Sequence, residues 1–92
     1  MRNCVYKYAL PIEDWATVEM PVGAEVLCVQ VQNQQPYLWA RVQPDSPTVP
    51  RCFRVAGTGH ELGTDVGRYI GSFQLHGGHL VFHVFTEKTE EL

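Results

Sequence analysis

The chain has 92 residues, of which 45% are hydrophobic and 18% are charged, a length and composition typical of one globular domain. Its formal net charge of −3 at pH 7 provides no broad positive field, which argues against non-specific binding to DNA or RNA. The sequence has neither an apolar run of about 18 residues nor an apolar leader, so we expect no membrane span and no secretory signal.

Short runs of β-branched and aromatic residues, punctuated by Gly, Pro, Asn and Asp, predict an all-β chain. No window has the apolar spacing of an amphipathic helix. In chain order, we expect strands at residues 4–10, 17–20, 25–32, 38–43, 51–56, 68–75 and 79–85. They form a single β domain over residues 1–86, followed by a solvated C-terminal tail over residues 87–92.

Alternation along these strands predicts which side chains share a face. The sets on a common face of their strand are Val18 and Met20; Leu27, Val29 and Val31; Leu38, Ala40 and Val42; Phe53 and Val55; Tyr69, Phe73 and Leu75; and Leu80, Phe82 and Val84. We expect these faces to meet in one dry core.

The connections are expected to differ in kind. Residues 33–37 form a five-residue link between two strands, and the proline-rich residues 44–50 form an extended surface loop. Residues 57–67 form a further loop, and Gly77-Gly78 is a strong signal for a two-residue hairpin. Six to seven strands joined mainly by hairpins favour a small antiparallel sandwich or barrel, two architectures that the pattern does not separate. Because a domain of this size buries a modest share of its surface, a homo-oligomer is also compatible with the sequence.

Gly57, Thr58, Gly59 and His60 form the most distinctive loop. Consecutive flexible residues expose backbone N–H groups that can form a nest for an anion, with a hydroxyl and an imidazole beside them. The loop is neither a P-loop, which requires a Gly-Lys-Ser/Thr sequence before a helix, nor a dinucleotide fingerprint. The alternatives are a site that contacts a ligand or partner and a structural turn.

Arg41, Arg51 and Arg54 lie on strands at either end of the proline-rich loop, where up to two of them can converge to clamp a phosphate or carboxylate. The opposite parity of Arg51 and Arg54 argues against both pointing the same way, and solvated or ion-paired arginines are the alternative. Trp39 shares a strand face with Arg41 and Gln43, a mixture typical of partner-binding surfaces; core or edge packing is the alternative.

The sequence predicts no metal site, no cofactor and no enzyme activity. Cys4, Cys28 and Cys52 lack the spacing of a disulfide framework or a zinc site, which indicates free thiols and a reducing cytoplasm. His76 and His79 flank the predicted hairpin closely enough to share a metal, but no third ligand has a suitable spacing. No nucleophile elbow or paired catalytic carboxylate is evident.

A pattern of short motifs covers about 80 of the 92 residues. It consists of Lys7-Tyr8, Pro11-Ile12-Glu13-Asp14, Val18-Glu19-Met20-Pro21, Gly23-Ala24, Val29-Gln30-Val31-Gln32, Pro36-x-Leu38-Trp39-Ala40, Gly57-Thr58-Gly59-His60, Tyr69-Ile70-Gly71-Ser72-Phe73-Gln74-Leu75 and Gly77-Gly78-x-Leu80-Val81-Phe82-His83. The pattern resembles a family of short phage and prophage proteins. The resemblance implies a phage or prophage origin, and it assigns no activity and no residue role.

Together these features predict a small non-enzymatic accessory or anti-defence protein in the cytoplasm of a bacterial host. We expect it to sequester a host protein or a small anionic, nucleotide-like ligand. Candidate binding residues are Trp39, Arg41, Arg51, Arg54, Gly57, Thr58, Gly59 and His60. The alternatives are a structural or assembly module of the virion, and a small hydrolase or metal enzyme using His60, His76 or His79.

Overall fold

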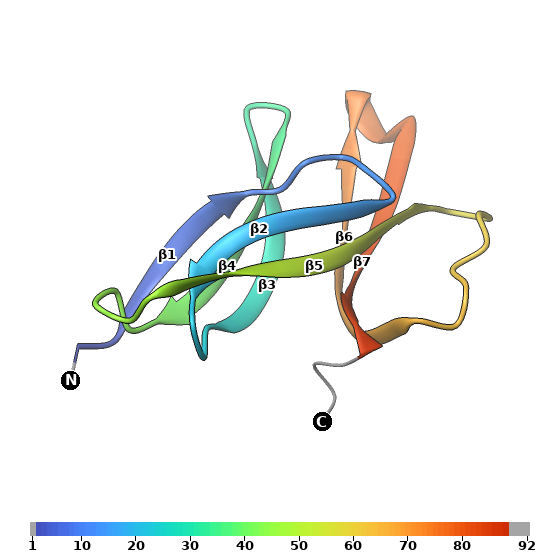
Figure 1. Cartoon of the computed structure of the whole chain (residues 1–92). Helices are drawn as coiled ribbons and strands as arrows, with labels where there is room; N and C mark the ends of the chain where they lie inside the picture. The colour runs from blue at the N-terminus through green and yellow to red at the C-terminus, as the bar shows by residue number, and fades with distance from the viewer. Residues whose placement is uncertain (1, 89–92) are drawn as a thin grey trace.

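The computed structural model of the chain describes residues 2–88, which form two antiparallel β-sheets packed face to face (Figure 1). One sheet has the order β1-β4-β3 and the other the order β2-β5-β7-β6. The strands are β1 (Cys4–Ala9), β2 (Trp15–Pro21), β3 (Glu25–Gln32), β4 (Gln35–Val42), β5 (Thr48–Gly57), β6 (Val66–Leu75) and β7 (Leu80–Glu87). A short 3-10 helix, η1 (His76–Gly78), lies between β6 and β7. The predicted all-β fold is confirmed, and of the two architectures that the sequence left open it is the sandwich.

The core lies between the two sheets and follows most of the predicted alternation. Tyr69 and Leu80, which the alternation assigns to the core, are 50% and 43% exposed, because register shifts flank Tyr69 and Leu80 begins β7 next to the turn. β4 buries Leu38, Ala40 and Val42 on one face, while β2 buries Ala16, Val18 and Met20. The core-lining side chains of the remaining strands are Val26, Val29, Phe53, Val55, Phe73, Leu75 and Val84. Burial of alternate residues on each strand is therefore the main source of stability.

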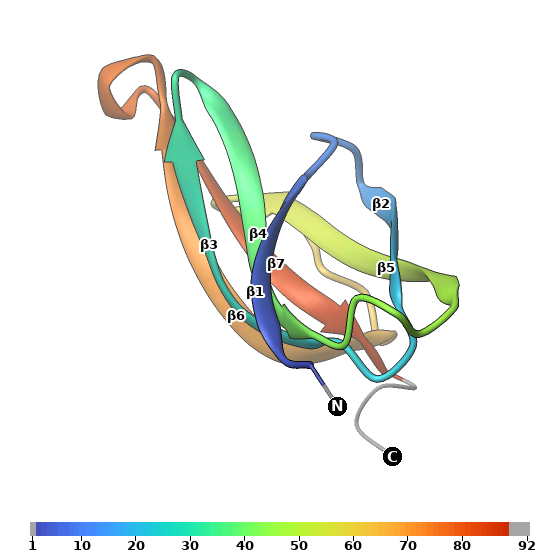
Figure 2. The same ribbon diagram turned by 90° about the vertical axis from the view of Figure 1, so that its left-hand side faces the viewer.

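The two sheets lie close together along one side and stand apart along the other (Figure 2). On the close side, β3 runs beside β6, where Arg68 Nη2 is 3.4 Å from the carbonyl oxygen of Val26. A Cβ atom added to Gly71 would lie 3.2 Å from Cγ1 of Val29, so glycine permits this approach. On the other side, β1 and β2 are the free edges of their sheets. The sheets consequently form a sandwich and not a closed barrel.

Three connections differ from the predicted ones. Asn33 and Gln34 form a two-residue turn with φ values of 51° and 65°, so β4 begins at Gln35 and the predicted five-residue link is wrong. Thr48 and the two residues after it pair with β2, so the strand replaces the last part of the predicted proline-rich loop. The four residues 76–79 link Leu75 to Leu80, and the predicted two-residue hairpin at Gly77-Gly78 is wrong because η1 forms there.

Two further differences concern the side chain of Leu27 and the C-terminus. A bulge between Val26 and Cys28 leaves Leu27 exposed, although simple alternation places it with Val29. β7 includes Glu87, and the backbone N–H of Lys88 donates to the carbonyl of Asp65, so the ordered fold extends two residues past the predicted boundary. The rest of the predicted tail lies outside the described residues. Hairpins join only β3 to β4 and β6 to β7, fewer than the sequence predicts.

Candidate functional site

Nine of the side chains on the face of the β1-β4-β3 sheet that points away from the core lie opposite one another across all three strands. Because Leu38 and Ala40 are buried on one side of β4, the residues between and beside them point outward. The strand register arranges the nine in three rows across β1, β4 and β3. The rows are Val5, Arg41 and Glu25; Lys7, Trp39 and Cys28; and Ala9, Tyr37 and Gln30. We call this set the outer face.

Lys7 lies over the aromatic side chains of the outer face. Its Nζ is 4.5 Å from the centroid of the Tyr37 ring and 5.9 Å from that of Trp39. The same ammonium donates a 2.7 Å hydrogen bond to Oε1 of Gln32 on β3. A cation above an aromatic ring at an exposed site contributes about 0.5–1 kcal/mol. The outer face therefore presents a positive charge held over two large rings.

Trp39 is half-buried, and its indole N–H is covered without being hydrogen-bonded. Among the described residues, Nε1 of Trp39 is the one buried side-chain polar atom that has no hydrogen-bond partner. A buried donor without an acceptor costs roughly 1–3 kcal/mol. This cost belongs to the folded chain itself, because the covered N–H is not presented to a molecule on the surface; Trp39 offers the exposed part of its ring to a partner.

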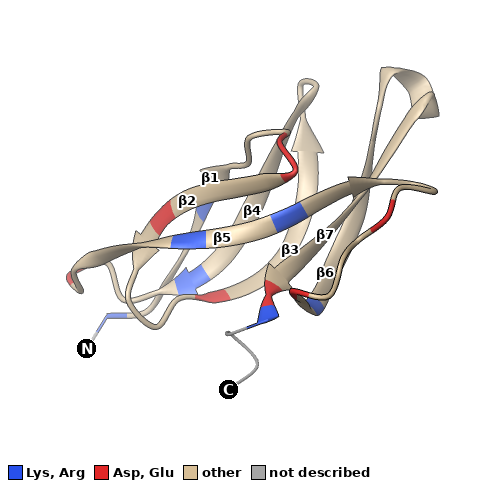
Figure 3. Ribbon diagram, turned by 45° about the vertical axis from the view of Figure 1, so that its right-hand side comes forward, with Lys and Arg blue, Asp and Glu red and all other residues tan. Residues whose placement is uncertain are grey.

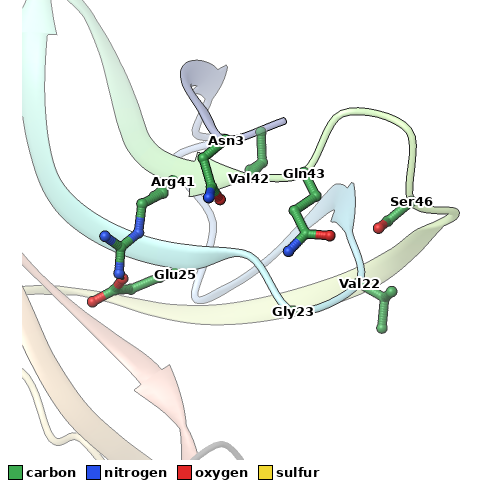
Figure 4. A pocket seen from close by; sticks show the side chains of 8 residues that line it. All are labelled: Asn3, Val22, Gly23, Glu25, Arg41, Val42, Gln43 and Ser46. Carbon is green, nitrogen blue, oxygen red and sulfur yellow. The ribbon is translucent and has the colours of Figure 1, made fainter. Parts of the chain in front are cut away.

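Arg41 forms an ion pair and does not present a free cation. Its Nη2 donates to Oε1 of Glu25, the residue opposite it in the ladder. The pair lies at the margin of an open hollow of about 550 Å³, which Asn3, Gln43 and Ser46 help to line (Figure 4). Because the carboxylate neutralises the guanidinium, this hollow offers no net positive charge to an anion.

The other two predicted arginines bind backbone carbonyls elsewhere in the fold. Nη1 of Arg51 donates to the carbonyl oxygen of Ala24 at 3.0 Å. Arg54 is only 8% exposed, and its guanidinium donates to four carbonyl oxygens, those of Asp14, Val55, Glu61 and Leu62. Arg51 and Arg54 both lie on β5, and Figure 3 shows the other cations spread over the rest of the fold. The structure therefore does not bring Arg41, Arg51 and Arg54 together in one anion clamp.

Residues 57–60 form a turn that packs against β7. Thr58 Oγ1 lies 2.8 Å from Nε2 of His83, and the His60 ring lies against Gly57, where an added Cβ atom would be 3.1 Å from Cε1 of His60. The backbone N–H groups of Thr58 and His60 donate to the carbonyls of Val81 and Gly57. These two amides are thus not available for the predicted anion nest, and the position of Gly59 at φ 90° is that of a turn residue.

A small hollow of about 180 Å³ lies beside this turn, lined in part by Leu62, His83 and Phe85. Ligand pockets commonly have volumes of about 300–1,000 Å³, so this hollow is small for a nucleotide. The hydroxyl and imidazole of Thr58 and His83 can exchange a hydrogen bond, with donor and acceptor set by the histidine tautomer. Residues 2–88 contain no group of three or more His, Cys, Asp or Glu side chains arranged to hold a metal ion.

A family model for a domain of unknown function, DUF7352, matches residues 1–92. The chain belongs to this family. No curated protein and no solved structure matches the DUF7352 chain. Within its described part, no helix has the length and apolar character needed to span a membrane. The surface chemistry of this DUF7352 domain is therefore the guide to its function.

The sequence alone identified Trp39 and Arg41 on one face. It missed Lys7 and Tyr37 of the outer face, and His83 beside the turn of residues 57–60. Lys7 and Tyr37 join Trp39 through the pairing of β1 with β4, and His83 joins Thr58 through the pairing of β5 with β7. Alternation indicates that Lys7 and Tyr37 face outward on their own strands. Which strands are neighbours has no signal in a single sequence, so the clusters are visible only in the fold.

Proposed function

We propose that this DUF7352 domain is a non-enzymatic binding protein that uses the outer face to hold a partner protein. The observation that carries the proposal is the Lys7, Tyr37 and Trp39 cluster, an aromatic and cationic patch on the outer surface of a rigid sheet. Trp and Tyr are enriched where partners dock, because each contributes a large contact area and a polar group. The resemblance to phage and prophage proteins favours a bacterial host protein as the partner.

The chemistry of the outer face favours a particular kind of partner surface. Exposed Val5 adds apolar area beside the rings, while Lys7 is a donor. A complementary partner would bring apolar side chains together with a carboxylate or carbonyl oxygen placed near Lys7. That oxygen would compete with Gln32 for the Lys7 ammonium.

The small anionic ligand receives less support than the protein partner. Arg41 is paired with Glu25, Arg54 is committed to backbone carbonyls, and the hollow beside Thr58 is small. A large open face with a central tryptophan is better suited to another macromolecular surface than to a nucleotide. Sequestration of a host factor, as in an anti-defence protein, is the role that we propose for this binding.

The test is capture of host proteins from bacterial lysate by tagged protein, with quantitative mass spectrometry of the bound fraction. We expect one enriched host protein, and we expect Trp39→Ala and Lys7→Glu to reduce its recovery at least tenfold. Trp15→Ala is the matched control, because Trp15 is 40% exposed on the other sheet and should leave capture unchanged. Circular dichroism confirms that each variant is folded. Equal capture by all variants, or no enriched protein, would overturn the proposal.

A further inference from the structure

One hydrogen bond just past the end of β1 shows which residues of this strand bond to β4. The backbone N–H of Leu10 donates to the carbonyl oxygen of Pro36 at 3.0 Å, in the same register that pairs Tyr8 with Leu38. In an antiparallel ladder, alternate residues direct both backbone groups toward the neighbouring strand. The residues of β1 at even positions therefore bond to β4. The backbone groups of Val5, Lys7 and Ala9 point away from β4, toward the free edge of the sheet.

The free edges of the fold differ in how well they resist pairing with another strand. β3 and β6 lie beside each other. β2 carries the charged Glu19 and ends at Pro21, two features that discourage strand addition. β1 has no proline, and its single charge, Lys7, is held back over Tyr37 and bound to Gln32. The edge of β1 is thus the one left open to a further strand.

We propose that β1 pairs antiparallel with β1 of a second copy of this chain, with the two-fold axis at Tyr6. In this register Val5 faces Lys7 of the second copy, and Lys7 faces its Val5, so the outward-pointing backbone groups of both residues bond across the axis. The β1-β4-β3 sheets of the two copies join into one six-stranded sheet. The two outer faces then form one surface that carries two Lys7 and Trp39 clusters.

The sequence of β1 suits a second copy in this register. Val5 is 57% exposed and Tyr6 is 42% exposed, and the pairing covers both. The first carbons of the Lys7 side chain lie opposite Val5 of the second copy while its ammonium stays over Tyr37, and no charged residue faces a like charge. A register with the axis at Lys7 would oppose Lys7 to Lys7, which is unfavourable. The register halfway between these two is also excluded. It would place residues whose backbone groups bond to β4 opposite residues whose backbone groups point toward the free edge.

The dimer is expected to be weak, since a six-residue edge strand is only about 20 Å long and small interfaces are usually transient. Sedimentation velocity of the purified full chain from about 5 to 500 µM should show a monomer at the low end and a growing dimer fraction at the high end. Monomer throughout this range would overturn the proposal.

Charge variants at the exposed Val5 position test the register. Val5→Lys places two like-charge pairs in each dimer and should weaken dimerisation about tenfold, whereas Val5→Glu faces Lys7 of the second copy and should strengthen it. The double variant Val5→Lys with Lys7→Glu restores opposite charges and should restore the dimer. Equal dimerisation by the Val5→Lys and Val5→Glu variants would refute the register.

Cross-linking gives an independent measurement of the axis. In a background with Cys4, Cys28 and Cys52 replaced by serine, Tyr6→Cys places two thiols opposite each other, so oxidation should yield a disulfide-linked dimer. Thr17→Cys, on the other free edge, should remain monomeric under the same conditions. Comparable cross-linking at both positions would contradict pairing through β1. Host-protein capture by the wild-type chain, at the low concentration where it is monomeric, would preserve the proposed function even if the dimer is absent, so the two proposals fail separately.

Discussion

Replacement of Arg54 tests whether this arginine holds the fold together and has no part in binding an anion. Its side chain leaves β5 and reaches two other segments, the link between β1 and β2 and the loop between β5 and β6. Donor–acceptor distances are 3.1 Å to Asp14, 2.8 Å to Val55, 2.8 Å to Glu61 and 3.4 Å to Leu62, in each case to the carbonyl oxygen. Because Arg54 is nearly buried, water can replace few of these hydrogen bonds when the side chain is removed and the fold stays intact.

The magnitude follows from the three shorter bonds. A hydrogen bond to a charged group contributes about 1.5–3 kcal/mol when its partner cannot be replaced by solvent. The carbonyls of Asp14 and Glu61 belong to exposed residues and can rehydrate after truncation. We therefore expect Arg54→Ala to lower the free energy of unfolding by about 2–4 kcal/mol. Arg54→Lys should lose about half as much, because an ammonium cannot match the planar fork that contacts several carbonyls.

Urea denaturation followed by circular dichroism measures these differences. Arg41→Ala is the control, since the Arg41 side chain is 60% exposed and its ion pair with Glu25 should contribute less than about 1 kcal/mol. Hydrogen exchange of residues 58–65 should accelerate in Arg54→Ala and stay unchanged in Arg41→Ala. If Arg54→Ala unfolds within about 0.5 kcal/mol of the wild type, the carbonyl contacts do not have the structural role that we assign them.

Three further substitutions probe other parts of the fold. Gly71→Val should destabilise the protein by about 1–3 kcal/mol in urea denaturation, because its side chain would meet Val29 between β3 and β6; Gly71→Ala should cost less. Gln34→Gly should raise the melting temperature, because the positive φ at this turn position favours glycine; a lower value would contradict the assigned turn. Burial, with a further contribution from Tyr6, raises the pKa of Tyr8, so its contribution to stability is complete below about pH 10 and is lost as the pH rises through the higher value of the folded state. Tyr8→Phe should therefore lose less stability than the wild type in denaturation series above pH 10.

Local sequence signals predicted the strands and the core well, because both depend on properties of short segments. The bounds of β3 match the predicted ones, and Leu38, Ala40 and Val42 are buried as alternation requires. The errors arise where one residue changes the period or the turn. A bulge at Leu27 and positive φ values at Asn33 and Gln34 are set by how β3 meets β4, which composition does not encode.

The candidate site was less predictable, because parity gives the side of a strand but not what covers that side. Arg54 and Trp39 both point away from the core of their sheets, and sequence reasoning treated both as candidates for binding. The loop between β5 and β6 closes over Arg54 and uses its guanidinium, while the ammonium of Lys7 lies 5.9 Å from the centroid of the Trp39 ring. The path of this loop, which depends on the whole fold, therefore decides that Arg54 has a structural role while Trp39 stays part of an outer face. For this domain, strand parity reduces the surface to two outer faces, and the loop between β5 and β6 then removes Arg54 from the second of them.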